Sequence, residues 1–310
     1  MSLSAVASVR RLLLAPTQRP SWQESPRPLT QAAKGLALAV IVVAVLLPFW
    51  IVLSTSLSPL NEVNRGGGYT LWPDHPTLQA YRDITRSGLI SHATVVSVLL
   101  VLIGTATSLA CTILLAYALS RPNVVGGRLV LKCVLVAFLF PPGMIPSYLI
   151  VSQLHLVNNY SALVLPTVID VFNLVVLRGF FQGLPTELYE AARLDGAGEA
   201  RILLRIVLPL SRSVVAVVGF FYGVAYWNDY FKGLFYLSGA DKWPLGTLLR
   251  MLVIGGNSPD SSGQSLATLQ INAQADLMAT IVVAVVPIAL AYPFLQRFFS
   301  RGVLTGAVKS

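Results

Sequence analysis

Long apolar runs without a charge alternate along the chain with shorter polar segments. Charges are absent from residues 36–53, 87–120 and 133–169. A helix crosses a bilayer with roughly 20 mostly apolar residues, so the last stretch is long enough for two crossings, divided at the polar residues 153–159. Three prolines and a glycine within residues 141–146 must break or kink the first of these two. The pattern predicts six membrane-spanning helices, at residues 36–53, 93–119, 133–152, 160–177, 206–230 and 277–296.

The amino-acid composition excludes a soluble domain and a disordered chain. Hydrophobic residues make up 55% of the 310 residues and charged residues 11%, whereas a soluble domain carries about a quarter of its residues as charges. Disordered segments have low hydrophobicity. A net charge of +9 indicates nucleic-acid binding only on a solvated basic surface, so we expect no nucleic-acid partner. The predicted fold class is an all-α, polytopic membrane protein surrounded by a lipid bilayer.

Residues that build metal sites and catalytic centres are sparse. Cys111 and Cys133 both lie in apolar runs, and the three histidines show no metal-site spacing, so we expect no disulfide scaffold and no metal. The phosphate-binding pattern Gly-x-x-x-x-Gly-Lys-Ser/Thr is absent, and no nucleophile–base pattern is present. We therefore expect no catalytic residue, no cofactor bound by this chain and no ATP hydrolysis by it.

Basic residues are distributed unevenly between the loops. If the N-terminus is cytoplasmic, 16 of the 22 basic residues fall on the cytoplasmic side, as the positive-inside rule requires. Both termini are therefore predicted to be cytoplasmic, with external loops at residues 58–88 and 238–275. The predicted parts are a basic arm (1–34), a membrane domain (35–300) and a C-terminal tail (301–310). The arm is either an unstructured tail or a segment that lies on anionic lipid.

One cytoplasmic loop, residues 184–206, combines helix-start, helix-stop and acidic residues. Proline is favoured at the first helical position, so Pro185 predicts the start of a helix, and Gly196 predicts its end. A second short helix is predicted from Glu199, and Pro209 marks its junction with the fifth span. The two adjacent alanines of the first helix would allow a close approach to another surface.

Seven residues of this region follow a fixed spacing, namely Glu190, Ala191, Ala192, Gly196, Ile206, Leu208 and Pro209. The spacing resembles the signature of permease subunits of bacterial ABC importers: Glu-Ala-Ala, three residues, Gly, nine residues, Ile, one residue, Leu-Pro. The resemblance implies the type I importer permease fold, and it implies that residues 185–205 form a coupling helix that docks into a cleft on an ATPase subunit. The residues implied in this contact are Glu187, Glu190, Ala191, Ala192, Asp195, Gly196, Ile206, Leu208 and Pro209.

Further segments resemble the MalG-type sugar permeases and, within them, the LplC/YtcP-like branch. The similarity lies in residues 71–81, 144–156, 173–181 and 226–229 and in the C-terminal tail. In that family the tail reaches between the ATPase subunits, which implies such contacts for Gly302, Thr305, Gly306 and Lys309. The resemblance also implies a bacterial cytoplasmic membrane, a second homologous permease, two ATPases that bind ATP-Mg, and an external solute-binding protein. The implied cargo is an oligosaccharide from polysaccharide breakdown, acidic or neutral.

Polar and aromatic residues within the predicted spans are candidates for a transport pathway. A charge inside the bilayer is expensive, which makes Asp170 and the nearby Asn173 functional candidates. They either hydrogen-bond sugar hydroxyls or hold the helices together. An aromatic group late in the fifth span also has two interpretations, since Tyr and Trp stack on sugars and gather at membrane interfaces. Its candidate residues are Tyr222 and Tyr226, which are preferred as ligands, with Trp227 and Asn228.

Two function classes remain at this point. An ion-coupled secondary transporter would use an intramembrane charge such as Asp170 as its coupling site, but it leaves the spacing in the cytoplasmic loop unexplained. We therefore expect a non-catalytic permease subunit that moves a carbohydrate by alternating access, driven by ATP hydrolysis on a separate subunit.

Overall fold

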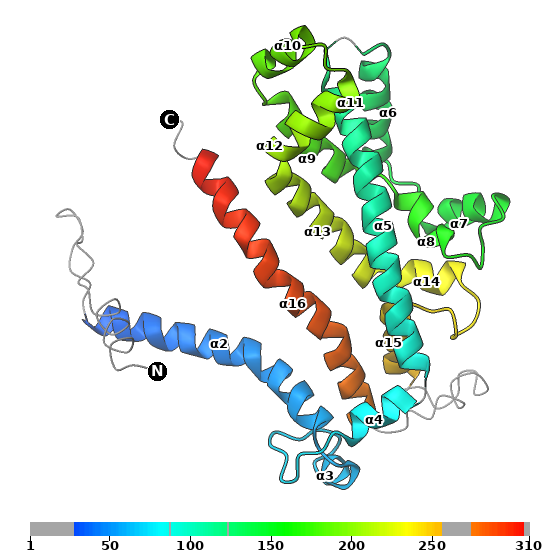
Figure 1. The fold of residues 1–310 in the computed structure, drawn as a ribbon. Coiled ribbons are helices and arrows are strands. Elements are labelled where there is room, and N and C mark those ends of the chain that lie inside the picture. The colour runs from blue at the N-terminus through cyan, green and yellow to red at the C-terminus, as the bar shows by residue number, and fades with distance from the viewer. Residues whose placement is uncertain (1–27, 87, 123, 256–273, 307–310) are drawn as a thin grey trace. The chain divides into compact units, whose positions relative to one another are not determined.

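A computed structural model of the protein describes the backbone of residues 28–86, 88–122, 124–255 and 274–306. Within these ranges every regular element is helical (Figure 1), so the all-α class predicted from the sequence is confirmed. The chain divides into two compact units, residues 1–50 and 51–310, which are described separately.

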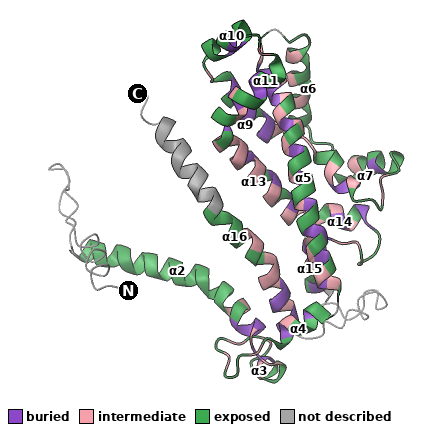
Figure 2. Ribbon diagram, in the orientation of Figure 1, coloured by how far each residue is buried: buried purple, intermediate pink, exposed green. Residues whose placement is uncertain are grey.

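The described part of the first unit is most of helix α2 (Pro28–Ser56). This 29-residue helix covers the first predicted span and extends it at both ends. Residues 28–34, which were predicted to belong to the arm, are therefore helical, while the rest of the arm lies outside the described residues. The side chains of residues 29–50 are exposed within the chain (Figure 2), as expected of an apolar helix whose surroundings are lipid or another subunit.

The second unit is built around α5 (Leu89–Ser120), a continuous helix of 32 residues. It packs against α13 (Arg212–Asn228) and α9 (Val171–Gln182). Glycine lets two of these backbones approach closely, since a Cβ atom added at Gly219 of α13 would lie 3.3 Å from Leu109 Cδ2 on α5. Small residues are the usual means of close helix packing in membranes.

Short helices lie along α5 and at both of its ends. They are α3 (Leu60–Arg65), α4 (Gln79–Arg86), α8 (Ser161–Val164), the 3₁₀ turn η1 (Leu165–Thr167), α10 (Thr186–Leu194), α11 (Glu199–Ile202), the π turn η2 (Leu203–Val207), α12 (Leu208–Leu210), α14 (Phe231–Tyr236) and α15 (Leu245–Gly255). Figure 1 shows α3, α4 and α15 near one end of α5, and α10 and α11 at the other. The loops predicted to be external thus lie opposite the loop predicted to be cytoplasmic.

The number of membrane spans differs from the sequence prediction. Among the described residues, the helices long and apolar enough to cross a bilayer alone are α2, α5 and residues 274–293 of α16 (Gln274–Gly306). Two bent helix pairs are long and apolar enough only when each pair is counted as one span: α8 and η1 join α9 with a bend of 51°, and α11–α12 join α13 with a bend of 86°. The structure supports up to five spans, so the predicted count of six is not confirmed.

The difference arises at the predicted third span, which is divided into α6 (Gly127–Leu139) and α7 (Met144–Gln153). Pro141 and Pro142 have no N–H to donate, and Gly143 has a φ of +75°, so the first helix cannot continue through them. The sequence predicted a break here. Each remaining helix, of 13 and 10 residues, is too short to cross a bilayer.

The predicted C-terminal tail continues the last helix, because α16 extends to Gly306. The structure describes side chains of α16 only as far as residue 293, so the contacts implied for Gly302, Thr305 and Gly306 stay predictions. Lys309 lies outside the described residues, as do residues 256–273 of the second external loop.

Candidate functional site

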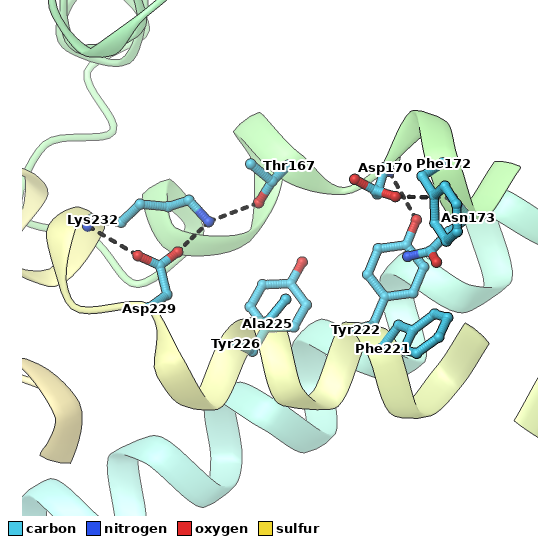
Figure 3. Close-up of a pocket in the computed structure, with 10 residues that line it drawn as sticks. All are labelled: Thr167, Asp170, Phe172, Asn173, Phe221, Tyr222, Ala225, Tyr226, Asp229 and Lys232. Atoms are coloured by element: carbon cyan, nitrogen blue, oxygen red, sulfur yellow. Dashed lines mark hydrogen bonds and ion pairs between the residues drawn. The ribbon is translucent and has the colours of Figure 1, made fainter. Parts of the chain in front are cut away.

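A pocket of about 430 Å³ lies beside α13, between the start of α9 and α14 (Figure 3). Polar groups, charges and aromatic rings line it together, which is unusual among otherwise apolar helices. Its lining residues are Thr167, Asp170, Phe172, Asn173, Phe221, Tyr222, Ala225, Tyr226, Asp229 and Lys232. The fold thus brings four of the predicted pathway residues into one pocket.

The two tyrosines of this group lie one turn apart on the same face of α13. Tyr222 is 3% exposed and Tyr226 is 4% exposed. The Tyr222 hydroxyl is 2.6 Å from Thr112 Oγ1 on α5, and it accepts the N–H of Asp170 at 2.8 Å. The Tyr226 hydroxyl is 2.7 Å from Ser108 Oγ, also on α5. Because both hydroxyls are hydrogen-bonded within the chain, the tyrosines line the pocket as buried side chains in fixed positions.

Asp170 lies at the break within the fourth predicted span and not inside a continuous helix. It is the N-cap of α9, with an extended backbone at φ −85° and ψ 128°. Its Oδ1 accepts the N–H of Asn173 at 2.9 Å, which satisfies one of the free N–H groups at a helix start. The residue is otherwise exposed at the pocket, so Asp170 both caps α9 and lines the pocket.

Asn173 is the buried polar side chain of the pocket, with 4% of its surface exposed. Its Oδ1 atom is buried and has no hydrogen-bond partner among the described residues. A buried acceptor without a donor is unfavourable by about 1–3 kcal/mol. Asn173 therefore combines a place in the lining of the pocket with an unsatisfied acceptor.

Two charged residues of the pocket, Asp229 and Lys232, were not singled out from the sequence. They form an ion pair at the end of α13, and Lys232 Nζ also donates to Thr167 Oγ1 at 3.0 Å. The side chain of Lys232 is 23% exposed and that of Asp229 is 18% exposed. In the sequence, their opposite charges three residues apart, directly after the aromatic group, could have indicated an ion pair. Only the bend after α13 turns this pair toward the pocket.

Trp227 and Asn228, two further predicted pathway residues, lie outside the polar pocket. Trp227 Nε1 donates to the carbonyl of Ala284 on α16 at 3.1 Å, and its ring lines a separate apolar groove of about 480 Å³. Asn228 is exposed and donates to the carbonyl of Val224 at 2.9 Å. Neither lines the polar pocket, so their place in a transport pathway stays a prediction.

The loop predicted to be cytoplasmic folds as its sequence indicated. Helix α10 begins directly after Pro185 and ends before Asp195, and Gly196 adopts a φ of +74°. α11 begins at Glu199, and the chain bends near Pro209, between α12 and α13. The positions of these turns, predicted from single residues, are confirmed.

The surface of α10 differs from the prediction in one respect. Ala192 is 8% exposed and packs into the interior of the unit with Tyr189, so of the two alanines only Ala191 faces outward. Glu187 and Glu190 are exposed beside it. The outward face of α10 is therefore acidic, with one small residue at its centre.

Contacts with α5 fix the inward side of the loop. The hydroxyl of Tyr117, near the end of α5, donates to the carboxylate of Glu199, and Arg193 Nη2 lies 2.8 Å from the other oxygen of that carboxylate. These hydrogen bonds hold the pKa of Glu199 below its ordinary value. The guanidinium group of Arg121 lies against the rings of Tyr117 and Tyr189.

Comparison with known proteins accounts for this arrangement. Residues 94–305 match the family described as binding-protein-dependent transport system inner membrane component. The chain belongs to this family. The YtcP protein of Bacillus subtilis strain 168, a polygalacturonan/rhamnogalacturonan transport system permease, is 40% identical to it over 281 residues, which cover 89% of this chain and 96% of YtcP. LplC of the same organism is 38% identical over 264 residues, covering 85% and 89% of the two chains.

A solved structure has the same fold. A chain of a bacterial ABC transporter involved in the import of the acidic polysaccharide alginate superposes with a TM-score of 0.80 and is 26% identical, covering 91% of this chain and all of that one. The protein is therefore an inner-membrane permease subunit of an ABC importer. This conclusion excludes the alternative function class, an ion-coupled secondary transporter. The family match includes both the pocket and the loop predicted to be cytoplasmic. Among its described residues, no group of His, Cys, Asp and Glu could hold a metal ion.

Proposed function

We propose that this permease carries an oligosaccharide released by polysaccharide breakdown, and that the polar pocket lines its path. The observation that supports this most directly is the composition of the pocket: the rings of Phe172, Phe221, Tyr222 and Tyr226 beside the buried acceptor of Asn173. Aromatic faces stack on apolar sugar faces, while buried polar groups select hydroxyls. The similarity to a polygalacturonan/rhamnogalacturonan permease and to an alginate transporter agrees with such a cargo.

The charges of the pocket bear on acidic cargo. Asp170 and Asp229 supply two carboxylates and Lys232 one ammonium group, and this ammonium group is already paired with Asp229. An acidic saccharide would therefore need positive groups from the second permease subunit. The half of the path described here suits hydroxyls and neutral sugar rings better than carboxylates.

We also propose that the outward face of α10 docks on the ATPase. The face combines Glu187, Glu190 and Ala191 with Leu194, which is 89% exposed beyond the end of the bundle. A large apolar side chain and acidic residues along one helix face are suited to a protein cleft with an apolar floor and basic rim. Of the remaining residues implied in this contact, Asp195 and Gly196 form the turn that orients α10, whereas Ala192 is buried.

The assembly would contain this chain, a second homologous permease, two ATPase subunits that bind ATP-Mg, and an external solute-binding protein. This chain would bind no cofactor itself, and both of its termini would be cytoplasmic. Closure of the ATPases would move α10 and with it the helices joined to it. The two permease bundles would then alternate between inward-facing and outward-facing states.

Reconstitution of the complex in proteoliposomes tests the proposed cargo. We expect uptake of an oligosaccharide loaded on the binding protein to depend on ATP, and Asn173→Ala to raise the KM for uptake because the buried acceptor is lost. Gln153→Ala, which removes an exposed amide at the end of α7, serves as the control and should leave the KM unchanged. Equal KM values for Asn173→Ala and the wild type would contradict the proposed path.

A further inference from the structure

The guanidinium group of Arg121 lies between two tyrosine rings. Its carbon atom Cζ is 4.4 Å from the ring centre of Tyr117 and 3.5 Å from that of Tyr189. Arg121 directly follows the last residue of α5, whereas Tyr189 belongs to α10. A cation within about 6 Å of an aromatic ring centre is attracted to the ring face. Arg121 therefore attaches α10 to the end of α5.

Arg121 interacts with both ring faces and, through its charge, with the carboxylate of Glu199. Its Nε and Nη2 atoms are buried and have no hydrogen-bond partner among the described residues. Burial of such groups is unfavourable in itself, and the two ring faces offset this cost. A flat guanidinium group can stack on both rings at once, whereas the compact ammonium group of lysine cannot.

Other contacts attach the segments on either side of α10 to the same turn of α5. Tyr117 donates to the carboxylate of Glu199, the first residue of α11. On the other side, Arg178 Nε of α9 donates to the carbonyl of Leu119 at 3.0 Å. The last turn of α5 thus holds the helix before the loop, the helix of the loop and the helix after it.

The same helix also contacts the pocket. Ser108 and Thr112 pair with the hydroxyls of the two pocket tyrosines, and Thr112 precedes Tyr117 by five residues, or about 7.5 Å along a helix. No proline interrupts α5, so its pocket-facing part and its loop-facing end move together. A displacement of α10 is therefore transmitted to the pocket through one rigid element.

We propose that Arg121 is a positioning residue that couples α10 to the pocket through α5. This inference rests on the proposed docking of α10 on the ATPase. With Arg121 in place, the pocket and α10 move together through α5, so ATP hydrolysis responds to the state of the pocket. Without the stacked guanidinium group, α10 is held less firmly to α5, and more ATP is hydrolysed without transport.

Four variants of the full complex in proteoliposomes test this proposal. Arg121→Lys keeps the charge but loses the flat group, and Tyr189→Leu removes one ring, while Tyr189→Phe keeps that ring. Arg128→Lys is the matched control, because Arg128 is an exposed arginine at the start of α6. The readouts are the ratio of oligosaccharide transported to ATP hydrolysed, the ATPase rate without binding protein, and the amount of ATPase that co-purifies.

We expect Arg121→Lys and Tyr189→Leu to lower the transport ratio about fivefold or more, a usual size for coupling between sites. The ATPase should still co-purify and hydrolyse ATP in both variants, and Tyr189→Phe and Arg128→Lys should retain the wild-type ratio. An unchanged ratio in Arg121→Lys and Tyr189→Leu would overturn the proposal, and so would loss of the ATPase from both complexes, which would indicate a merely structural role. If Arg121→Lys does not assemble, the comparison of Tyr189→Leu with Tyr189→Phe shows whether the transport ratio depends on the ring at position 189.

Failure of the proposed docking would look different. In that case Glu190→Ala, on the outward face of α10, would leave ATPase binding unchanged. The Arg121 and Tyr189 variants leave the outward face intact, so they report on coupling through α5 alone.

Discussion

The left-handed turn at Gly196 allows a quantitative test of the docking loop. Gly196 has a φ of +74°, whereas Gly198, two residues later, has a φ of −71°. A Cβ atom would meet no other atom within 4 Å at either position, so the two positions differ in backbone conformation and not in space. A residue with a Cβ atom in the left-handed conformation costs roughly 1–2 kcal/mol. Gly196→Ala should therefore strain the loop by that amount, and Gly198→Ala should not.

The strain acts on the hydrogen bonds that end α10. The N–H of Gly196 donates to the carbonyl of Arg193 at 3.0 Å, and that of Ala197 donates to the carbonyl of Ala192 at 2.9 Å. Relief of the strain breaks these bonds and changes the direction of α10. A cost of 1–2 kcal/mol corresponds to a factor of about 5 to 30 in an equilibrium constant, so ATPase affinity should fall by up to that factor in Gly196→Ala.

Titration of the purified permease complex in nanodiscs with labelled ATPase measures this affinity. Thermal unfolding of the same samples checks that the membrane bundle is intact. Gly198→Ala should bind as the wild type does. Equal ATPase affinity for Gly196→Ala and Gly198→Ala, in intact complexes, would refute the view that the turn at Gly196 orients a docking helix.

Three further predictions concern stability, measured by thermal unfolding in detergent. Gly104→Ala places a Cβ atom 2.9 Å from the Tyr226 ring and should cost about 1–3 kcal/mol, whereas Gly179→Ala, with open space around it, should not; equal melting temperatures would contradict the packing. Tyr222→Phe leaves the Asp170 N–H and a threonine hydroxyl without their partner and should cost about 1–3 kcal/mol; an unchanged melting temperature would show that water replaces the hydroxyl. Glu199→Gln should cost under about 1 kcal/mol at neutral pH, since the pair is half exposed. Because hydrogen bonds lower the pKa of Glu199 below its ordinary value of 4.5, its stabilisation is present above that pH and is lost as the pH falls through the lowered pKa. The difference from the wild type should therefore shrink on acidification, and a difference independent of pH would exclude an ionised carboxylate.

The sequence predicted local features of the loop at residues 184–206 well, because single residues determine them. Proline before a helix and glycine in a left-handed turn act through their own backbone geometry, so the limits of α10 followed from Pro185 and Gly196. Which face of α10 is buried could not be predicted in the same way. That face is set by Tyr189 and Ala192 packing against the rest of the unit, and by Arg121, which lies 68 residues before Tyr189 in the sequence.

The pocket was predicted only in part, because its residues come together through breaks and bends in the helices. Hydrophobicity and aromatic content indicated Asp170, Asn173, Tyr222 and Tyr226 separately, but hydropathy cannot show where a span breaks. The break before α9 turned Asp170 from a charge within a helix into a helix cap. The bend after α13 brought Lys232, which lies just beyond the predicted fifth span, to the pocket.

The interruption between α6 and α7 has a consequence for hydration. Pro141 and Pro142 provide no N–H for the carbonyls one turn before them in α6, and carbonyls without a partner cannot face hydrocarbon. Water or polar groups of a neighbouring chain must therefore reach these carbonyls. Backbone amides just after the two prolines should then exchange hydrogen for deuterium faster than those in the middle of α5, so the prolines mark a place where the interior of the membrane protein is wet.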